Sequence, residues 1–231
     1  MITSPQNLEP KVYQGQFGQF TITNSDRSGV IVYRTSLLLA ALSFALASWL
    51  VLSQGSTPTV LKALTPLYAA FCLALGISLV TIHIYMASLH RVLQVFWGIG
   101  ASAAIILAVY SSEPLALYIY NQPLSVLGIG FTFAALTGIY FKEAFCFNRL
   151  ETKFLSPLVP LLLLGHLASI LPIYWEQLLL GIWAVLFMVF AIRKLVQPIP
   201  DDIGYFSRLA YGQYHVQASL FEQRQKPSKS N

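Results

Sequence analysis

Long apolar stretches separated by short charged breaks dominate this sequence. Six intervals contain no Asp, Glu, Lys or Arg, and they cover residues 35–61, 63–90, 92–112, 114–141, 154–175 and 177–192. A helix rises about 1.5 Å per residue and the hydrocarbon core of a bilayer is about 30 Å thick, so ~20 apolar residues cross it. Five intervals exceed that length, and the sixth reaches it once Glu176 and Arg193 extend to the interfaces.

These intervals predict an all-α, polytopic membrane protein built as a bundle of six transmembrane helices. The predicted transmembrane domain covers residues 34–195, with spans at residues 34–53, 64–86, 92–111, 124–141, 155–172 and 177–194. A soluble bundle would show a polar face on each helix, whereas these runs are apolar all round. An N-terminal segment, residues 1–33, and a C-terminal tail, residues 196–231, lie outside the membrane.

The two flanking segments carry weaker patterns. The sequence FGQFTITNSDRSGVIVY alternates around a turn-like NSDRSG, which fits either a small hairpin or, from Val30 onward, the start of the first helix. After the last span, PIPDD interrupts the chain and apolar residues then recur at helical spacing. We therefore expect an interfacial helix over residues 203–220, with Asp202 as its N-cap.

The basic residues lie almost entirely on one side of the predicted bundle. With six spans both termini share a side, and thirteen of the 14 Lys and Arg residues fall there, Lys62 being the exception. The positive-inside rule makes that side, and both termini, cytoplasmic. The chain is 56% hydrophobic and 10% charged with a net charge of +5, and this surplus is spread along one face. Nucleic acid is therefore not a predicted partner.

The break between the fourth and fifth spans, YFKEAFCFNRLETKF, gathers charges and phenylalanines. We expect an amphipathic linker on the membrane surface, with the phenylalanines in the headgroup region and the glutamates paired or hydrated. Aromatic residues beside arginine favour protein contacts, so this segment is also a candidate docking loop for a partner. Its residues are Lys142, Glu143, Phe145, Phe147, Arg149, Glu151 and Lys153.

Small residues recur at four-residue spacing on two predicted helices. The stripes are Gly130, Ala134 and Gly138 in the fourth span, and Gly100, Ala104 and Ala108 in the third. Such spacing lets helix backbones approach closely. It fits a dimer interface, and packing within the bundle is the simpler explanation.

Ionisable residues inside a membrane usually mark function, and only histidines qualify here. His83 and His90 lie near the cytoplasmic end of the predicted second span, seven residues apart and so on one face, and His166 lies deep in the fifth. His83 and His166 are candidate haem or metal ligands across helices. The structural alternative is ordinary hydrogen bonding of these histidines, and on that basis no cofactor and no metal site is predicted.

The two cysteines, Cys72 and Cys146, are far apart in the sequence. They give neither a disulfide framework nor the spacing of a metal site.

Three families of membrane proteins with a similar number of helices have known catalytic or haem-binding motifs, and we compared the sequence with these motifs. Intramembrane serine proteases need a GxSG serine on the fourth span, which here reads LGIGFTFAAL, and a histidine on the sixth, which has none. Prenyl endopeptidases need paired glutamates followed by an arginine four residues on, whereas Glu143 is single and Arg149 follows it by six. Di-haem cytochromes need paired histidines at both membrane depths. No enzymatic activity is therefore predicted.

The stretch FKEAFCFNRLETKFLSPLVPLLLLGHL resembles a family of uncharacterised integral membrane proteins, domain of unknown function 2301, found mainly in cyanobacteria. The matching residues are 142–144, 151–158 and 165–166, and we expect the likeness to extend over residues 30–200. The resemblance implies a cyanobacterial plasma or thylakoid membrane. It implies no activity and no functional residues.

The sequence favours an accessory, scaffold or assembly role, in which the bundle contacts the lipid bilayer and other membrane proteins. A small-solute transporter or channel is the alternative, because Pro157 and Pro160 interrupt a helix that also carries Ser156 and His166. A redox protein that binds haem or metal through His83 and His166 is the third hypothesis.

Overall fold

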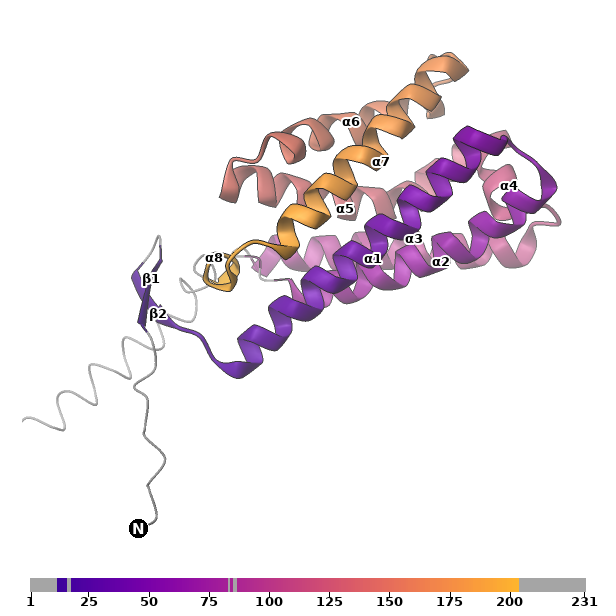
Figure 1. The fold of residues 1–231 in the computed structure, drawn as a ribbon. Coiled ribbons are helices and arrows are strands. Elements are labelled where there is room, and N and C mark those ends of the chain that lie inside the picture. Colours follow the sequence, from indigo (N-terminus) through magenta and orange to yellow (C-terminus); the bar gives the residue numbers. More distant parts are fainter. Residues whose placement is uncertain (1–11, 16–17, 83, 85–86, 204–231) are drawn as a thin grey trace, which may run out of the picture.

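The computed structural model describes residues 12–15, 18–82, 84 and 87–203 of the chain (Figure 1). An antiparallel hairpin of β1 (Val12–Gly15) and β2 (Gly18–Thr21) precedes the helices. The helices are α1 (Asn24–Gln54), α2 (Pro58–Thr81), α3 (Ala87–Tyr110), α4 (Leu115–Asn121), α5 (Val126–Phe147), α6 (Leu150–Leu167), α7 (Ile173–Leu195) and α8 (Ile199–Ile203). A 3-10 turn, Pro123–Ser125, leads into α5.

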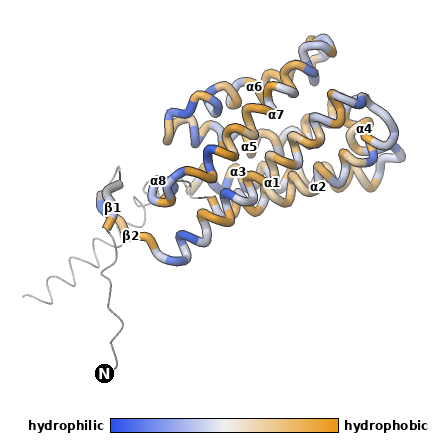
Figure 2. Tube along the Cα trace, in the orientation of Figure 1, coloured by the Kyte–Doolittle hydropathy of each residue, from blue (hydrophilic) through white to orange (hydrophobic). Residues whose placement is uncertain are grey.

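Within these residues, 6 helices are long and apolar enough to cross a membrane, namely α1, α2, α3, α5 with its preceding turn, α6 and α7. Figure 2 shows hydrophobic residues along these helices and hydrophilic residues concentrated toward their ends. Many large apolar side chains face outward, as expected where lipid replaces water. The predicted six-helix transmembrane bundle is confirmed.

The six long helices contact one another in a closed ring. α1 lies between α2 and α7, α3 contacts α2 and packs along α5, and α6 lies between α5 and α7. Aromatic rings fill the interior: Phe71 stacks on Phe133 with centroids 5.6 Å apart, and Trp183 lies 4.4 Å from Phe44 and 5.3 Å from Phe133. Such tilted and offset pairs add to the energy of burial.

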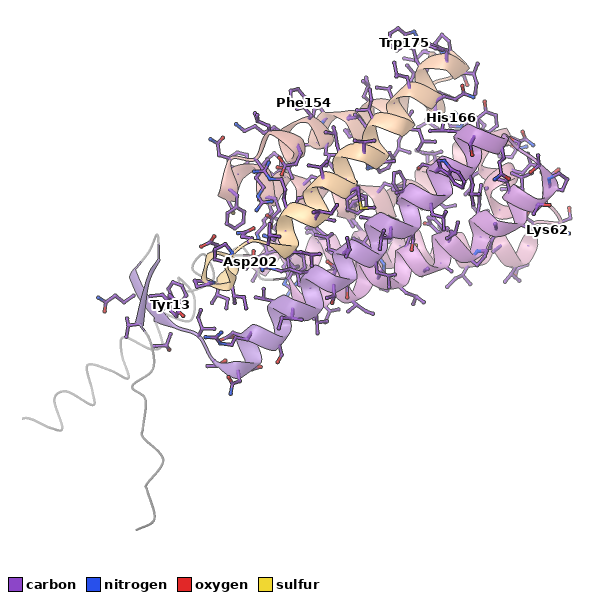
Figure 3. The ribbon with its side chains drawn as sticks, viewed as in Figure 1. Tyr13, Lys62, Phe154, His166, Trp175 and Asp202 are labelled. Atoms are coloured by element: carbon purple, nitrogen blue, oxygen red, sulfur yellow. The ribbon has the colours of Figure 1, made fainter. Side chains whose placement is uncertain are left out.

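The two ends of the bundle differ in their charged residues. We call the end where α1 begins and α7 ends the basic end, because Arg34, Lys142 and Lys194 lie there, and the opposite end, with Lys62, the distal end. Figure 3 labels Asp202 toward the basic end, and His166 and Lys62 toward the distal end. The cytoplasmic position of the basic end stays a prediction.

The first helix begins at Asn24, ten residues before the predicted span. Thr23 and Asp26 form a capping box, in which Thr23 Oγ1 accepts from the Asp26 backbone at 3.1 Å and Asp26 accepts from the Thr23 backbone at 2.9 Å. Of the two alternatives for this segment, the predicted hairpin centred on NSDRSG is wrong, because the cap makes that sequence the first turns of α1. The hairpin that forms lies earlier, with Tyr13 opposite Phe20.

Two other predicted boundaries also change. α2 ends at Thr81 and α3 begins at Ala87, so His90 lies in the first turn of α3 and not near the end of the second span as predicted. His90 Nε2 instead contacts the Leu79 carbonyl oxygen at 2.5 Å.

Asp202, the predicted N-cap of an interfacial helix, is buried within the short helix α8. The rest of that predicted helix lies outside the described residues.

The small-residue stripes lie partly between α3 and α5. Gly100 faces Thr132 and Gly138 faces Leu93, so both glycines allow close approach of the two helices. Ala104 is also buried. Ala108 and Ala134 are exposed and Gly130 is half-buried. Packing within the bundle therefore accounts for Gly100 and Ala104 of the α3 stripe and for Gly138 of the α5 stripe, whereas Ala108 and Ala134 face outward.

Replacing Gly100 with alanine should lower the free energy of unfolding by about 1–3 kcal/mol, because the new methyl group would overlap the Thr132 backbone. Gly98→Ala is the matched control, since a methyl group there meets open space. It should be neutral or stabilise the helix by up to ~1 kcal/mol. Titration from mild detergent into dodecyl sulfate measures both, and equal stabilities would contradict this helix contact.

Candidate functional site

Charged side chains from five helices gather inside the bundle at its basic end. The buried members are Arg34 of α1, Lys142 and Glu143 of α5, Glu151 of α6, Lys194 of α7 and Asp202 of α8. We call this group the basic-end network. Lys142, Glu143, Glu151 and Lys194 come from the first or last two turns of their helices, Arg34 lies in the third turn of α1, and Asp202 belongs to the short helix α8. All of them lie outside the charge-free runs, which is why long apolar runs are compatible with so many buried charges.

Glu143 is the central acceptor of the basic-end network. Its carboxylate is fully buried and accepts hydrogen bonds from Lys142 Nζ at 2.8 Å and from Lys194 Nζ at 2.8 and 2.9 Å. The Tyr33 hydroxyl donates to the same carboxylate at 3.4 Å. Burying an ion is costly unless it is paired and hydrogen-bonded, and Glu143 satisfies both conditions.

Asp202 is the second acceptor and ties α8 to the bundle. It accepts from Arg34 Nε at 2.9 Å and Nη2 at 2.7 Å, and it is ion-paired with Lys194. Arg34 also donates to the backbone carbonyls of Gln197 and Pro198. Lys194 therefore bridges the two carboxylates, and the chain after α7 is held across the end of α1.

The predicted surface linker between the fourth and fifth spans requires correction. α5 continues to Phe147 and α6 starts at Leu150, so only a tight turn with Asn148 in the left-handed region joins them. This geometry turns Lys142 and Glu143 into the interior, where they meet the ends of α1 and α7.

The candidate docking residues therefore separate into three groups, which are buried, half-buried and exposed. Lys142, Glu143 and Glu151 are buried, so they are not available to a partner. Phe147 and Arg149 are half-buried, and Lys194 Nζ lies 4.4 Å from the Phe147 ring centroid. The exposed members are Phe145 and Lys153.

A cavity of about 470 Å³ opens toward the distal end, between α1, α2, α4, α5, α6 and α7. Its walls are mostly apolar and extend inward to the aromatic core at Phe44, Phe71 and Phe133. Loop residues Gly55 and Ser56 also line it, so it reaches the end of the bundle. We call it the distal cavity. Its volume falls within the range typical of small-molecule sites.

Polar side chains meet at one place on the wall of the distal cavity. His166 Nδ1 lies 2.7 Å from Glu176 Oε1, with both side chains largely buried, and the Tyr120 ring centroid lies 5.2 Å from the His166 ring. Burial and the nearby Glu176 carboxylate raise the pKa of Tyr120, so its hydroxyl stays a donor. Within the described residues, His166 Nε2 has no hydrogen-bond partner and remains able to bind a ligand.

His166 lies in the last turn of α6, at the bundle end, and not deep in a span as predicted. Since α6 begins at Leu150, only 18 residues form this helix and its end is near the surface. His83 lies outside the described residues. No group of three metal-binding side chains occurs among the described residues.

Sequence reasoning missed the network and the partner of His166. From the sequence, Arg34 and Lys194 count only among the basic residues that orient the bundle, Asp202 is predicted as an N-cap, and Glu176 marks the end of a span. One signal was present: charged residues of both signs occur at the ends of the first, fourth and sixth spans, all on one side. Opposite charges at one membrane depth can pair inside a bundle, which is cheaper than burying either alone.

Six apolar helices around an aromatic core, with charges confined to their ends, define an integral multi-pass membrane protein. The chain belongs to a family described as uncharacterised integral membrane protein (DUF2301), whose family model matches residues 77–211. This confirms the family suggested by the sequence around residues 141–167.

A relative of this chain with a matching sequence has no activity in its description. An uncharacterised protein of Haemophilus influenzae is 30% identical over 179 residues, which cover 76% of this chain and 86% of that protein. No solved structure gives a significant match. The cyanobacterial origin and the choice between plasma and thylakoid membrane stay predictions.

Proposed function

We propose that the protein binds a small, mainly apolar molecule with one polar group in the distal cavity. The distal cavity carries this proposal, because its apolar walls converge on a single polar cluster of His166, Glu176 and Tyr120. Apolar walls supply affinity in proportion to the area they cover, and a few placed polar groups fix orientation. The ligand therefore has an apolar body and one hydrogen-bonding head.

The ligand head should contact His166. With Glu176 holding Nδ1, the imidazole presents Nε2 to a ligand that accepts or donates a hydrogen bond. The Tyr120 hydroxyl is a second donor nearby. The ligand body would lie toward Phe71 and Phe133, which line the inner part of the cavity.

A carrier fits this arrangement better than an open channel. The distal cavity reaches one end of the bundle, while Glu143, Lys194 and Asp202 fill the other end with paired charges. A ligand could thus enter from the distal side only in this conformation. Passage to the basic end would require the ion pairs to separate, as in a carrier that opens to each side in turn.

Replacing His166 with alanine should weaken binding of the ligand about tenfold, because one hydrogen bond to its head is lost. The measurement is native mass spectrometry of protein purified in mild detergent, with the bound molecule identified after solvent extraction. Tyr174→Ala is the control, since Tyr174 is exposed near Glu176 and does not line the cavity. Equal occupancy in both variants would refute the assignment of the head to His166.

An accessory role remains the second proposal, supported by exposed phenylalanines at the basic end. Phe141, Phe145 and Phe154 are all more than half exposed, and the rings of Phe141 and Phe145 have centroids 4.8 Å apart. Exposed Lys153 provides charge beside them. Paired aromatics next to a cation are typical of contact surfaces between proteins.

Substituting Phe145 with serine should remove any stable complex made through this surface. The change leaves the basic-end network intact, because Phe145 faces away from Glu143 and is 77% exposed. Blue native electrophoresis of membranes measures the complex, with Phe154→Ser compared at the far side of the same surface. Identical migration of the wild type and both variants would count against an accessory role.

A further inference from the structure

A second cavity lies at the basic end, beside the buried ion pairs. Its volume is about 370 Å³. It is lined by Phe147, Arg149, Arg193, Val196, Gln197, Pro198 and Asp201. We call it the guanidinium pocket, since two arginines from different helices reach it. It is separate from the distal cavity and shares no lining residue with it.

The guanidinium pocket contains a buried donor that lacks an acceptor. Gln197 is 8% exposed, and its Oε1 accepts from Arg149 Nη2 at 2.7 Å while its Nε2 has no partner. Arg149 Nη1 is also without a hydrogen bond, but Glu151 Oε1, which is unpartnered as well, lies 3.7 Å from it, so these two atoms form an ion pair with each other. Buried polar groups are nearly always satisfied, so Gln197 Nε2 is the donor that is available to an acceptor in the pocket.

The two arginines at the guanidinium pocket outnumber the carboxylate that is paired with them. Arg149 and Arg193 share a single carboxylate, Glu151, at 3.7 and 2.7 Å. Before Asp201 is counted, two guanidinium groups against one carboxylate give a surplus of one, which matches a phosphodiester, and the Asp201 carboxylate at the same pocket balances that surplus. Guanidinium is well suited to phosphate, because its planar fork can donate two parallel hydrogen bonds.

Asp201 adds a negative charge to the guanidinium pocket. Its carboxylate is exposed and lines the same pocket, where it would repel a simple anion. A ligand with an ammonium group next to its phosphate removes that conflict, since the ammonium can donate to Asp201. The pocket thus has complementary groups for both ends of a small zwitterion.

The guanidinium pocket also lies at the right depth for a lipid headgroup. Arg193 is in the last turn of α7 and Arg149 is the N-cap residue of α6, so both mark the ends of membrane spans. Apolar surface continues beside them, because Val196 is 80% exposed and Leu150 is 66% exposed. Acyl chains attached to the headgroup would cover that surface.

We propose that the guanidinium pocket binds the phosphoethanolamine headgroup of a membrane lipid. The phosphate accepts hydrogen bonds from Arg149, Arg193 and Gln197, and the ammonium donates to Asp201. This site stands independently of the ligand proposed for the distal cavity.

The test is native mass spectrometry of the delipidated full-length protein with ethanolamine, choline and glycerol phospholipids of identical acyl chains. The wild type should retain the ethanolamine lipid in preference to both others. Arg193→Gln should lower that retention about tenfold, since charge-assisted hydrogen bonds are lost. Asp201→Asn should abolish the preference over the choline lipid, whose quaternary ammonium has no N–H. Arg91→Gln, at an exposed arginine of α3, should change nothing.

Soluble glycerophosphoethanolamine separates the lipid from a free headgroup compound, and it should not displace the bound lipid at equal concentration. Three results would overturn the proposal: equal retention of the three lipids by the wild type, unchanged retention in Arg193→Gln, or displacement by the soluble compound. Arg193 is 54% exposed as a side chain, so its variant should fold, and the unfolding midpoint verifies this.

Discussion

Replacing Glu143 with alanine should lower the free energy of unfolding by about 3–5 kcal/mol, one of the two largest effects expected in this protein. Lys194 would keep Asp202 as its carboxylate partner and lose Glu143. Lys142 would also lose Glu143, which is the only carboxylate paired with it in the described residues. Lys142 would then be a buried cation without a carboxylate partner, and burying an unpaired ion is costly. Titration from mild detergent into dodecyl sulfate measures the loss.

Two further variants show whether the loss comes from unpaired charge. Glu113→Ala removes an exposed glutamate at the distal end and should change stability by less than about 0.5 kcal/mol. The double variant Glu143→Ala/Lys194→Met should lose less than the sum of its single changes, because it removes both members of one pair. Strict additivity would show that Glu143 and Lys194 do not interact.

The second large effect is expected at Asp202, where alanine should cost about 3 kcal/mol. Arg34 would keep the carbonyl oxygens of Gln197 and Pro198, and Lys194 would keep Glu143, so the cost is smaller than at Glu143. Asp201→Ala is a closely matched control, since the adjacent carboxylate is exposed.

Limited proteolysis reports on the local consequence of this change. In Asp202→Ala, α8 should separate from α1 and the chain after Leu195 should be cleaved faster than in the wild type. Equal cleavage of both aspartate variants would contradict the role of Asp202 in holding α8 against the bundle.

The membrane spans could be predicted from the sequence because charge-free intervals are a direct consequence of bilayer thickness. The residues at which the helices begin and end could be predicted less accurately from the sequence. The start of α1 depends on a capping box at Thr23 and Asp26, which converts a turn-like sequence into helix. The segment around Asn148 is charged, which predicts a surface linker, although Lys142, Glu143 and Glu151 turn inward.

The basic-end network was hidden for a different physical reason. Charged residues at helix ends either reach water or pair with one another, and the sequence does not tell which. The choice depends on α8, which folds back and brings Asp202 to Arg34 and Lys194. The link between His166 and Glu176 was similarly hidden, because it requires knowing that α6 ends only one turn after Leu163.

The distal cavity depends entirely on the three-dimensional arrangement. Its walls come from six helices, and no local pattern marks Tyr120 or Leu180 as neighbours of His166. Predicting it would have required the order of helices in the ring. By contrast, the sequence did suggest Gly100 and Gly138 as close contacts, because small residues have a recognisable spacing.

The proposed ligand in the distal cavity, with its polar head at His166, can be observed in an experimental structure of the protein purified from its own membrane in mild detergent. We expect elongated density that begins within hydrogen-bond distance of His166 Nε2 and runs toward Phe71. A cavity collapsed around its own side chains, or filled with water alone, would contradict the proposal.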